Sequence, residues 1–310
     1  MSEKNKIIVI LGPTASGKSD IAVALALRLR SGQAKKLGVK GAEIISADSR
    51  QVYKGLNIGT GKITKKEMEG VKHYLLDVTS AKKRFTASDY KILAEKAIQE
   101  ILDKRKVPII CGGTGFYIDA LLGDKQIPEV PPNLKLRKQL EKKSVEELFE
   151  ILKKLDPERA ETIERQNPRR LMRAIEIVKK LGRVPKYEAR DMKYDVLKIG
   201  IKIPEEKLKK RINKRIEKWF RQGLLKEVRN LHKKGLSWKR MGEIGLEYKL
   251  VSLFLQNKIS KEDMVERMQI ETRQYAKRQM TWFKKDKSII WRVHEDLNLD
   301  QPFWRRLFYH

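Results

Sequence analysis

The sequence predicts an α/β fold, in which a parallel sheet carries helices on both faces and an all-helical segment is inserted into the chain. Over residues 1–123, short apolar runs rich in β-branched residues alternate with longer helical patterns, which is typical of such a sheet. Glycine-rich turns follow several of these runs. Three prolines within residues 128–132 end the alternation, and the charged, helical pattern that follows indicates the insertion.

The expected elements can be placed along the chain in order. In the first part, strands are predicted at 7–11, 43–46, 74–78 and 107–111, and helices at 18–30, 88–104 and from near Gly115. After the insertion we predict a strand at 196–203, a long helix at 205–234 that breaks near Gly223, helices at 248–256 and 261–284, and a strand at 289–293. The chain is therefore divided into a core of residues 1–123 and 196–310 and a helical insertion of residues 124–195.

Within the insertion, four leucines and two proline dipeptides carry the helical prediction. The expected apolar face consists of Leu134, Leu140, Leu148 and Leu155. Asp156-Pro157 and Asn167-Pro168 are typical of helix starts, because proline is tolerated in the first turn.

The turn after the first strand has the pattern of a phosphate-binding loop, or P-loop. Residues 12–19 read Gly-Pro-Thr-Ala-Ser-Gly-Lys-Ser between an apolar strand and a helix, which is the context that this motif requires. Its backbone N–H groups form an anion-binding nest at a helix N-terminus. Lys18 adds a positive charge, and the Ser19 hydroxyl can act as a ligand for Mg²⁺. The sequence thus predicts a P-loop NTPase-like sheet that binds a di- or triphosphate at Gly12, Pro13, Thr14, Ala15, Ser16, Gly17, Lys18 and Ser19.

Charge and composition narrow the class of partner. The chain has 70 Lys and Arg residues against 40 Asp and Glu, a formal net charge of +30. This excess favours a polyanionic partner, although a lysine-rich proteome or a high-temperature source would also produce it. A single cysteine, Cys111, excludes a disulfide framework, and no apolar run is long enough to span a membrane. We expect a cytoplasmic protein without membrane association.

Further candidate residues follow the strands or lie on the later helices, and each has a structural alternative. Asp48, after the second strand, suits a general base or Mg²⁺ ligand, or a turn aspartate. Three glycines around Thr114 allow a ligand to approach its hydroxyl, but such turns are common. Arg211 and Arg215, four residues apart, could bind one anion or form a solvated face. Asp77 is a weaker candidate for the aspartate that closes a strand in nucleotide-hydrolysing P-loop proteins.

The C-terminal block 272–283 mixes cations with aromatic side chains. This combination suits backbone phosphates and stacked bases, although an amphipathic core helix with a basic outer face would have the same composition.

Taken in order, these blocks resemble the tRNA dimethylallyltransferases, also called tRNA isopentenyltransferases. The resemblance covers nearly the whole chain and is carried by residues 12–19, 45–55, 57–62, 112–117, 167–171, 211–215 and 272–279. One departure is the segment Met-Gly-Glu-Ile-Gly-Leu-Glu at 241–247, where acidic Glu243 and Glu247 replace neutral or basic residues of a tRNA-contacting segment.

The resemblance implies a chemistry and a set of roles. The family transfers a dimethylallyl group from dimethylallyl diphosphate to N6 of the adenine immediately 3′ of the tRNA anticodon (position 37). Lys18 and Ser19 with Mg²⁺ would then neutralise the leaving diphosphate, supported by Arg215. Asp48 matches the general base, and Thr114 the threonine beside the reacting centre. Positions matching tRNA contacts are Ser49, Arg50, Gln51, Arg137, Gln166, Asn167, Pro168, Arg169, Arg170, Lys277, Arg278 and Gln279.

Three other interpretations stay open at this stage. A P-loop small-molecule or nucleotide kinase would share the loop and sheet but has no need of the basic excess. An adenylate-type isopentenyltransferase would prenylate a free nucleotide, and the basic insertion argues against it. A non-catalytic RNA-binding module would not need Asp48, Thr114 and a complete P-loop. We expect a monomer, since nothing in the sequence requires a dimer.

Overall fold

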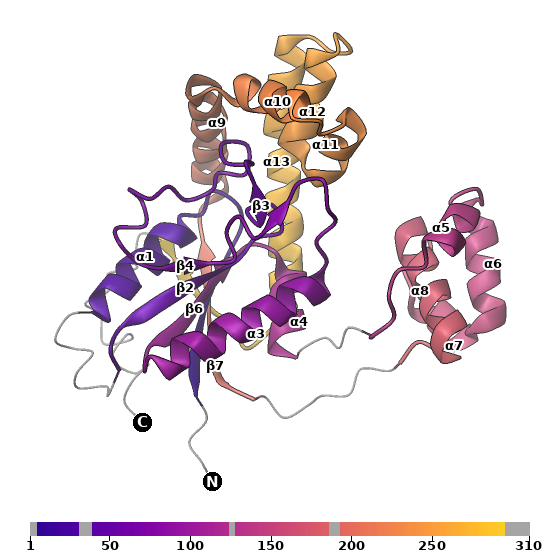
Figure 1. Cartoon of the computed structure of the whole chain (residues 1–310), viewed down its shortest axis with the longest axis horizontal. Coiled ribbons are helices and arrows are strands. Elements are labelled where there is room, and N and C mark those ends of the chain that lie inside the picture. Colours follow the sequence, from indigo (N-terminus) through magenta and orange to yellow (C-terminus); the bar gives the residue numbers. More distant parts are fainter. Residues whose placement is uncertain (1–4, 31–38, 124–127, 186–192, 295–310) are drawn as a thin grey trace. The chain divides into compact units, whose positions relative to one another are not determined.

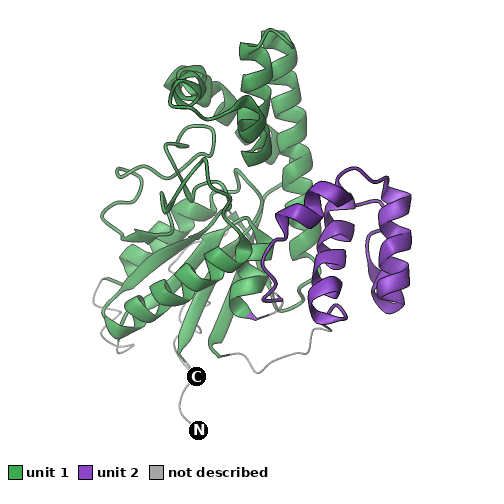
Figure 2. Cartoon of the chain, turned by 45° about the vertical axis from the view of Figure 1, so that its right-hand side comes forward, with its two compact units in different colours: residues 1–122, 191–310 green, residues 123–190 purple. Residues whose placement is uncertain are grey.

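The computed structural model describes residues 5–30, 39–123, 128–185 and 193–294. The chain forms two compact units, one of residues 1–122 and 191–310 and the other of residues 123–190 (Figure 2). The smaller unit corresponds to the expected insertion of residues 124–195. Within the described ranges, no helix is both long and apolar enough to cross a bilayer.

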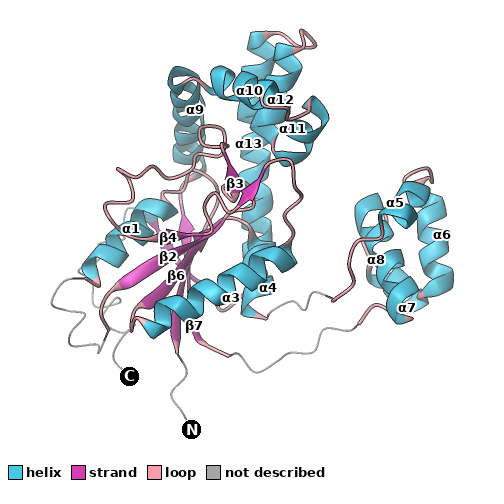
Figure 3. Ribbon diagram, viewed as in Figure 1, coloured by secondary structure: helices cyan, strands magenta, loops and turns pink. Residues whose placement is uncertain are grey.

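The larger unit is built on a six-stranded, all-parallel sheet (Figures 1 and 3). Its strands, in spatial order, are β4 (His73–Tyr74), β2 (Ala42–Ala47), β6 (Val107–Gly112), β1 (Lys6–Leu11), β7 (Asp195–Lys202) and β8 (Ile290–Val293). The predicted α/β class and the return of the chain to this sheet after the insertion are confirmed. A separate two-stranded pair, β3 (Tyr53–Lys54) with β5 (Thr79–Ser80), was not predicted.

The central strands are buried on both faces, which is why they read as continuous apolar runs. Ile8 and Ile10 of β1 pack in one cluster with helix α1 (Lys18–Arg28). Ile7 and Val9 point to the other face and are equally buried. Helix α3 (Ala87–Asp103), which also packs on β2 and β6, begins with a capping box between Thr86 and Asp89.

Six further helices of the larger unit lie among the described residues, one before the insertion and five after it. They are α4 (Gly115–Leu122), α9 (Glu205–Gln222), α10 (Leu224–Lys233), α11 (Trp238–Ile244), α12 (Leu246–Leu255) and α13 (Lys261–Phe283). Gly223, with a φ of 94°, separates α9 from α10 and confirms the predicted break.

The strand predicted at 74–78 is wrong beyond Tyr74. Leu75 and Asp77 have φ values of 62° and 56°, which are left-handed and incompatible with a strand. Asp77 is exposed and forms an ion pair with Lys62 Nζ at 2.6 Å. Asp77 does not lie at the end of a strand at the sheet edge. It is therefore not placed as the aspartate of a nucleotide-hydrolysing site would be.

The smaller unit consists of four helices around a core of its own. They are α5 (Leu134–Leu140), α6 (Val145–Leu155), α7 (Pro157–Thr162) and α8 (Pro168–Leu181). Asp156 and Asn167 cap α7 and α8 with proline at the first position, as predicted. Leu140 and Leu148 are buried as expected, whereas Leu134 and Leu155 are exposed. On α6 the apolar stripe continues from Leu148 to Leu152, one turn later on the same face.

An ion pair inside the smaller unit uses one of the expected tRNA contacts. Nε and Nη2 of Arg137 on α5 donate to the two carboxylate oxygens of Glu176 on α8, at 2.8 and 2.7 Å. The Glu176 side chain is fully buried. Although burial alone would raise the pKa of Glu176, hydrogen bonds from Arg137 and the Asn133 amide outweigh it and lower that pKa.

The substitution Arg137→Met should destabilise the smaller unit by about 2 kcal/mol, because it leaves a buried carboxylate with fewer partners. Amide hydrogen exchange on α5 and α8 measures the loss. Lys138→Met, an exposed neighbour, should change stability by under about 0.5 kcal/mol. Since the Glu176 pKa is lowered in the folded state, this stabilisation is present at neutral pH and is lost as the pH falls below 4.5. Equal exchange in both variants would contradict a structural role for Arg137.

Cys111, at the end of β6, should resist alkylation in the folded protein. Burial raises the pKa of its thiol to about 11, so only about one molecule in a thousand carries the thiolate near pH 8. Mass spectrometry after iodoacetamide treatment should show slow labelling of the native chain and rapid labelling in denaturant. Rapid labelling of the native chain would contradict the buried position.

Candidate active site

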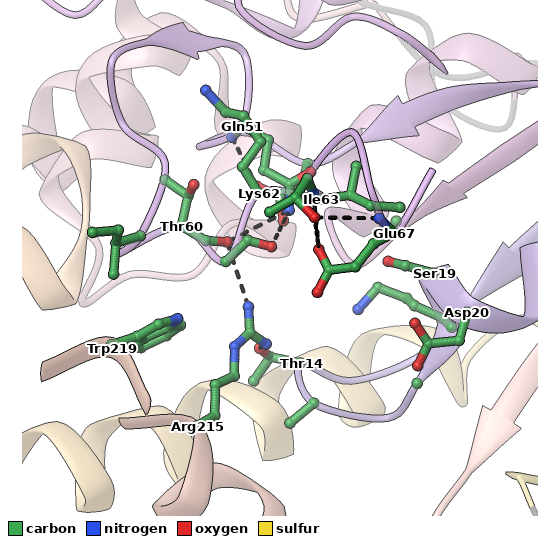
Figure 4. A pocket seen from close by; sticks show the side chains of 18 of the residues that line it. Thr14, Ser19, Asp20, Gln51, Thr60, Lys62, Ile63, Glu67, Arg215 and Trp219 are labelled. Atoms are coloured by element: carbon green, nitrogen blue, oxygen red, sulfur yellow. Dashed lines mark hydrogen bonds between the residues drawn. The ribbon is translucent and has the colours of Figure 1, made fainter. Parts of the chain in front are cut away.

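A cavity of about 760 Å³ lies at the carboxyl edge of the sheet, where P-loop proteins bind their ligands. It is lined by the β1–α1 loop, the end of β2, the loop 57–67, and side chains of α9 and α13. Figure 4 shows these groups converging: Arg215 reaches from α9 toward Thr14 and Thr60, with Ser19 and Asp20 on the opposite side. The site is assembled from segments that lie far apart in the sequence.

The β1–α1 loop has the conformation expected of a phosphate cradle. Gly17, at a φ of 86°, precedes the first turn of α1 and turns the loop into the helix. Lys18 Nζ folds back to donate to the Pro13 carbonyl at 3.1 Å. Burial lowers the pKa of Lys18, opposed by the nearby Cys111 and Asp48. In the described part of the chain, the fully buried Ser16 Oγ meets no hydrogen-bond partner, which leaves a donor available within the cradle.

Two arginines of α9 close the loop from the other side. Arg211 Nη1 donates to the Ser16 carbonyl at 3.2 Å, and Arg215 Nη1 donates to Thr14 Oγ1 at 3.1 Å. Gly61 leaves the room that the Arg215 guanidinium occupies, since a Cβ there would collide with it. This face of α9 therefore packs against the phosphate loop and is not a solvated face, while anion binding by the pair stays a prediction.

One carboxylate oxygen of Asp48 stabilises the turn in which the residue lies, and the other is available. Its Oδ1 accepts hydrogen bonds from the backbone N–H groups of Arg50 and Gln51, at 2.8 and 3.3 Å. No bond to Oδ2 is formed by the residues that the structure describes. Asp48 is half-buried and lines the cavity. The turn aspartate and the candidate base are thus the same residue, using different oxygens.

Thr114 links the turn that follows β6 to the turn that follows β2. Its Oγ1 accepts from the Ser49 backbone N–H at 3.0 Å, and its own N–H donates to the Ala47 carbonyl at 3.1 Å. Thr114 does not line the cavity itself. The structure brings it beside Ser49, next to Asp48 in the chain, so it lies behind the turn that presents Asp48.

Gly113 and Gly115, on either side of Thr114, make room for protein, whereas Gly112 lines the cavity. A Cβ at Gly113 would collide with the Gln279 amide, and one at Gly115 with the Trp282 ring. Both side chains come from α13, whose Trp282 also donates from Nε1 to Asp119 Oδ2 at 3.1 Å. The close approach that glycine allows here is that of helix α13.

The donor set of the cavity fits Mg²⁺ held jointly with a phosphate. Ser19, Asp20 and Asp48 line it and present the oxygen ligands that Mg²⁺ takes. Among the described residues, no group of three or more His, Cys, Asp or Glu side chains could hold a metal alone. Mg²⁺ at this site would therefore depend on phosphate oxygens and water for most of its coordination.

Sequence reasoning missed Glu227 of α10, which shapes one wall of the cavity. Its Oε2 accepts from the backbone N–H groups of Asn57 and Ile58 at 3.0 and 2.8 Å, and its Oε1 from Gly59 and from the Tyr248 hydroxyl. Three amides on one carboxylate fix the loop 57–62 against the helices. A carboxylate on a helix of ordinary composition gave no signal in the sequence.

The two acidic residues that depart from the family pattern have different surroundings. Glu243 accepts from Arg240 Nη1 at 3.1 Å on the surface of α11. Glu247 lies in the first turn of α12, where burial raises its pKa against the opposing charges of Arg215 and Arg50. Glu247 is therefore within electrostatic reach of Arg215, Arg50 and Asp48, although it does not line the cavity itself.

Of the expected tRNA contacts in the larger unit, some face outward and some do not. Arg50, Lys277 and Arg278 are exposed, and Ser49 is half-buried. Gln51 donates from Nε2 to the Gly61 carbonyl at 3.2 Å and lines the cavity. Gln279 is buried, with 7 % of its surface exposed.

In the smaller unit, the expected contacts gather at the start of α8. Gln166, Pro168, Arg169 and Arg170 are exposed. Asn167 caps the helix by accepting from the Arg170 N–H at 3.2 Å, and Arg170 pairs with Glu164 at 2.8 Å. Their contact with tRNA stays a prediction, as does that of Arg137.

Comparison with known proteins agrees with this geometry. The family model described as IPP transferase matches residues 51–286. The tRNA dimethylallyltransferase of Acetivibrio thermocellus is 38 % identical over 99 % of this chain and 97 % of its own length. The solved tRNA isopentenylpyrophosphate transferase of Bacillus halodurans is 32 % identical with a TM-score of 0.70, covering 98 % of this chain and 95 % of that one.

A solved eukaryotic dimethylallyltransferase acting on tRNA is also similar, with a TM-score of 0.79 and 27 % identity over 97 % of this chain and 77 % of that chain. The family model matches most of the chain, and relatives above 30 % identity match nearly its full length. Together these matches assign the protein to a family. This chain belongs to the IPP transferase family.

Proposed function

We propose that this protein transfers a dimethylallyl group from dimethylallyl diphosphate to N6 of the adenine 3′-adjacent to the anticodon of tRNA, and releases diphosphate. The observation that carries the proposal is the meeting of a phosphate loop, two arginines and Asp48 in one cavity. Relatives named tRNA dimethylallyltransferase, similar over nearly the whole chain, support the substrate assignment. The unit at residues 123–190 is proposed to bind the anticodon stem-loop.

In the proposed reaction, the C1–O bond of the prenyl diphosphate breaks as the C1–N6 bond forms. Lys18, Arg211 and Arg215 stabilise the negative charge that gathers on the departing diphosphate. Ser19, together with phosphate oxygens, would hold Mg²⁺, which would supply further neutralisation of this charge. Asp48, through Oδ2, accepts the proton that N6 loses, while its Oδ1 keeps the turn in place.

The adenine must leave its stack to enter the cavity, which costs a few kcal/mol. Exposed cations at Arg50, Lys277 and Arg278 are proposed to bind phosphates of the tRNA and offset this cost. We also propose that the protein acts as a monomer. A tRNA substrate supports a cytoplasmic location.

The test is incubation with dimethylallyl diphosphate, Mg²⁺ and an unmodified tRNA that has adenine 3′ of the anticodon. Mass spectrometry should find N6-prenyladenosine in the digested tRNA, with release of diphosphate. Two parallel arms replace the donor by ATP and the acceptor by free AMP. Phosphoryl transfer from ATP, or prenylation of AMP in preference to tRNA, would contradict the proposal in favour of a kinase or an adenylate isopentenyltransferase.

Asp48→Asn should lower kcat by about 10²- to 10⁴-fold, because asparagine keeps the acceptor for the turn but cannot take the N6 proton. Affinity for tRNA, measured by filter binding, should stay within about threefold of the unaltered chain. Asp48→Ala should lose turnover equally and lower the melting temperature further, since it also removes the turn acceptor. Loss of tRNA affinity in parallel with turnover in the asparagine variant would instead make Asp48 structural.

A further inference from the structure

Helix α13 buries one stripe of side chains that includes two polar residues. Thr272, Ala276, Gln279 and Phe283 are buried at spacings of four, three and four residues, which place them on one face. Gln279 is the longest polar side chain among them. A buried amide must have its hydrogen bonds satisfied, so its partners indicate why it is there.

Both ends of the Gln279 amide bind the sheet edge. The Thr14 backbone N–H donates to Gln279 Oε1 at 2.8 Å, and Gln279 Nε2 donates to the Gly113 carbonyl at 2.8 Å. One side chain thus connects the phosphate loop after β1 with the turn after β6. The absence of a Cβ at Gly113 leaves the space that the Gln279 amide occupies.

Each of these bonds ends next to a group of the candidate active site. Thr14, whose N–H binds Gln279, also accepts a hydrogen bond from Arg215 Nη1 on its side-chain oxygen. Gly113, held through its carbonyl, precedes Thr114, which binds the turn that presents Asp48. A displacement of Gln279 would therefore change the distance between Thr14, which binds Arg215, and the turn that carries Asp48.

We infer that Gln279 is a positioning residue that sets the phosphate loop and the Asp48–Thr114 turn at one fixed separation. This inference rests on the proposed function. This role replaces the direct tRNA contact that was expected at Gln279. Lys277 and Arg278, also on α13, are exposed to solvent, whereas the Gln279 side chain is buried against the phosphate loop. α13 then combines an outer basic face with an inner clamp on the phosphate cradle.

The variant Gln279→Met tests this, because methionine has a similar size and makes neither hydrogen bond. Its affinity for inorganic diphosphate, measured calorimetrically with Mg²⁺, should fall about tenfold, as expected for two lost hydrogen bonds. In the prenylation assay kcat should fall about tenfold as well, with the KM for tRNA within about twofold. Gln99→Met, the same change at an exposed position of α3, is the matched control and should behave as the unaltered chain.

Gln279→Glu separates the two bonds, since a carboxylate still accepts from Thr14 but cannot donate to Gly113. Its negative charge beside the cradle should weaken diphosphate binding beyond the methionine variant. Melting temperatures and tRNA affinity identify any variant that fails to fold. Weakened tRNA binding with unchanged diphosphate affinity in Gln279→Met would overturn the inference in favour of a tRNA contact, and so would unchanged values of both. The diphosphate measurement does not require prenyl transfer, so it decides this point even if the proposed reaction is absent.

Discussion

Repulsion among cations is the constraint on which the rest of this site depends. Lys18, Arg211 and Arg215 are gathered around one short loop, and burial disfavours the charged forms of Lys18 and Arg215. The protein offsets this by turning backbone carbonyls toward them, those of Pro13 and Ser16 among others. A compact anion bound in this loop would offset the repulsion among them. Gly61 admits the Arg215 guanidinium to the loop, and the carboxylates of Glu247, Asp48 and Glu67 favour its charged form.

The same constraint explains why the walls of the cavity are so firmly tied to one another. Charges can be held together only on a scaffold that does not relax, and the scaffold here is fixed by long-range hydrogen bonds. Glu227 holds the loop 57–62, and Thr114 holds the turn at Asp48. Preorganisation of this kind is where an enzyme obtains most of its electrostatic stabilisation, because nothing has to reorient during the reaction.

Much of the fold was predictable because its signals are local. Buried parallel strands read as apolar runs, the helix caps carry their own residue types, and the P-loop is a contiguous motif. The strand predicted to 78 failed at Leu75 and Asp77, whose left-handed backbone is imposed by the surrounding loops. The hydrogen bonds that Arg137 and Gln279 form within the protein were not predicted, for a different reason. The sequence shows that a side chain is polar, but whether it meets tRNA or a buried partner depends on contacts made across the fold.

The hydrogen bond from Thr14 to Gln279 spans 265 positions of the chain. It has a consequence for the order in which the molecule is made. The phosphate loop is synthesised 265 positions ahead of its clamp. Contacts of such sequence separation form late, after the loop closure they require. A nascent chain therefore carries an incomplete cradle until α13 has been synthesised and has docked.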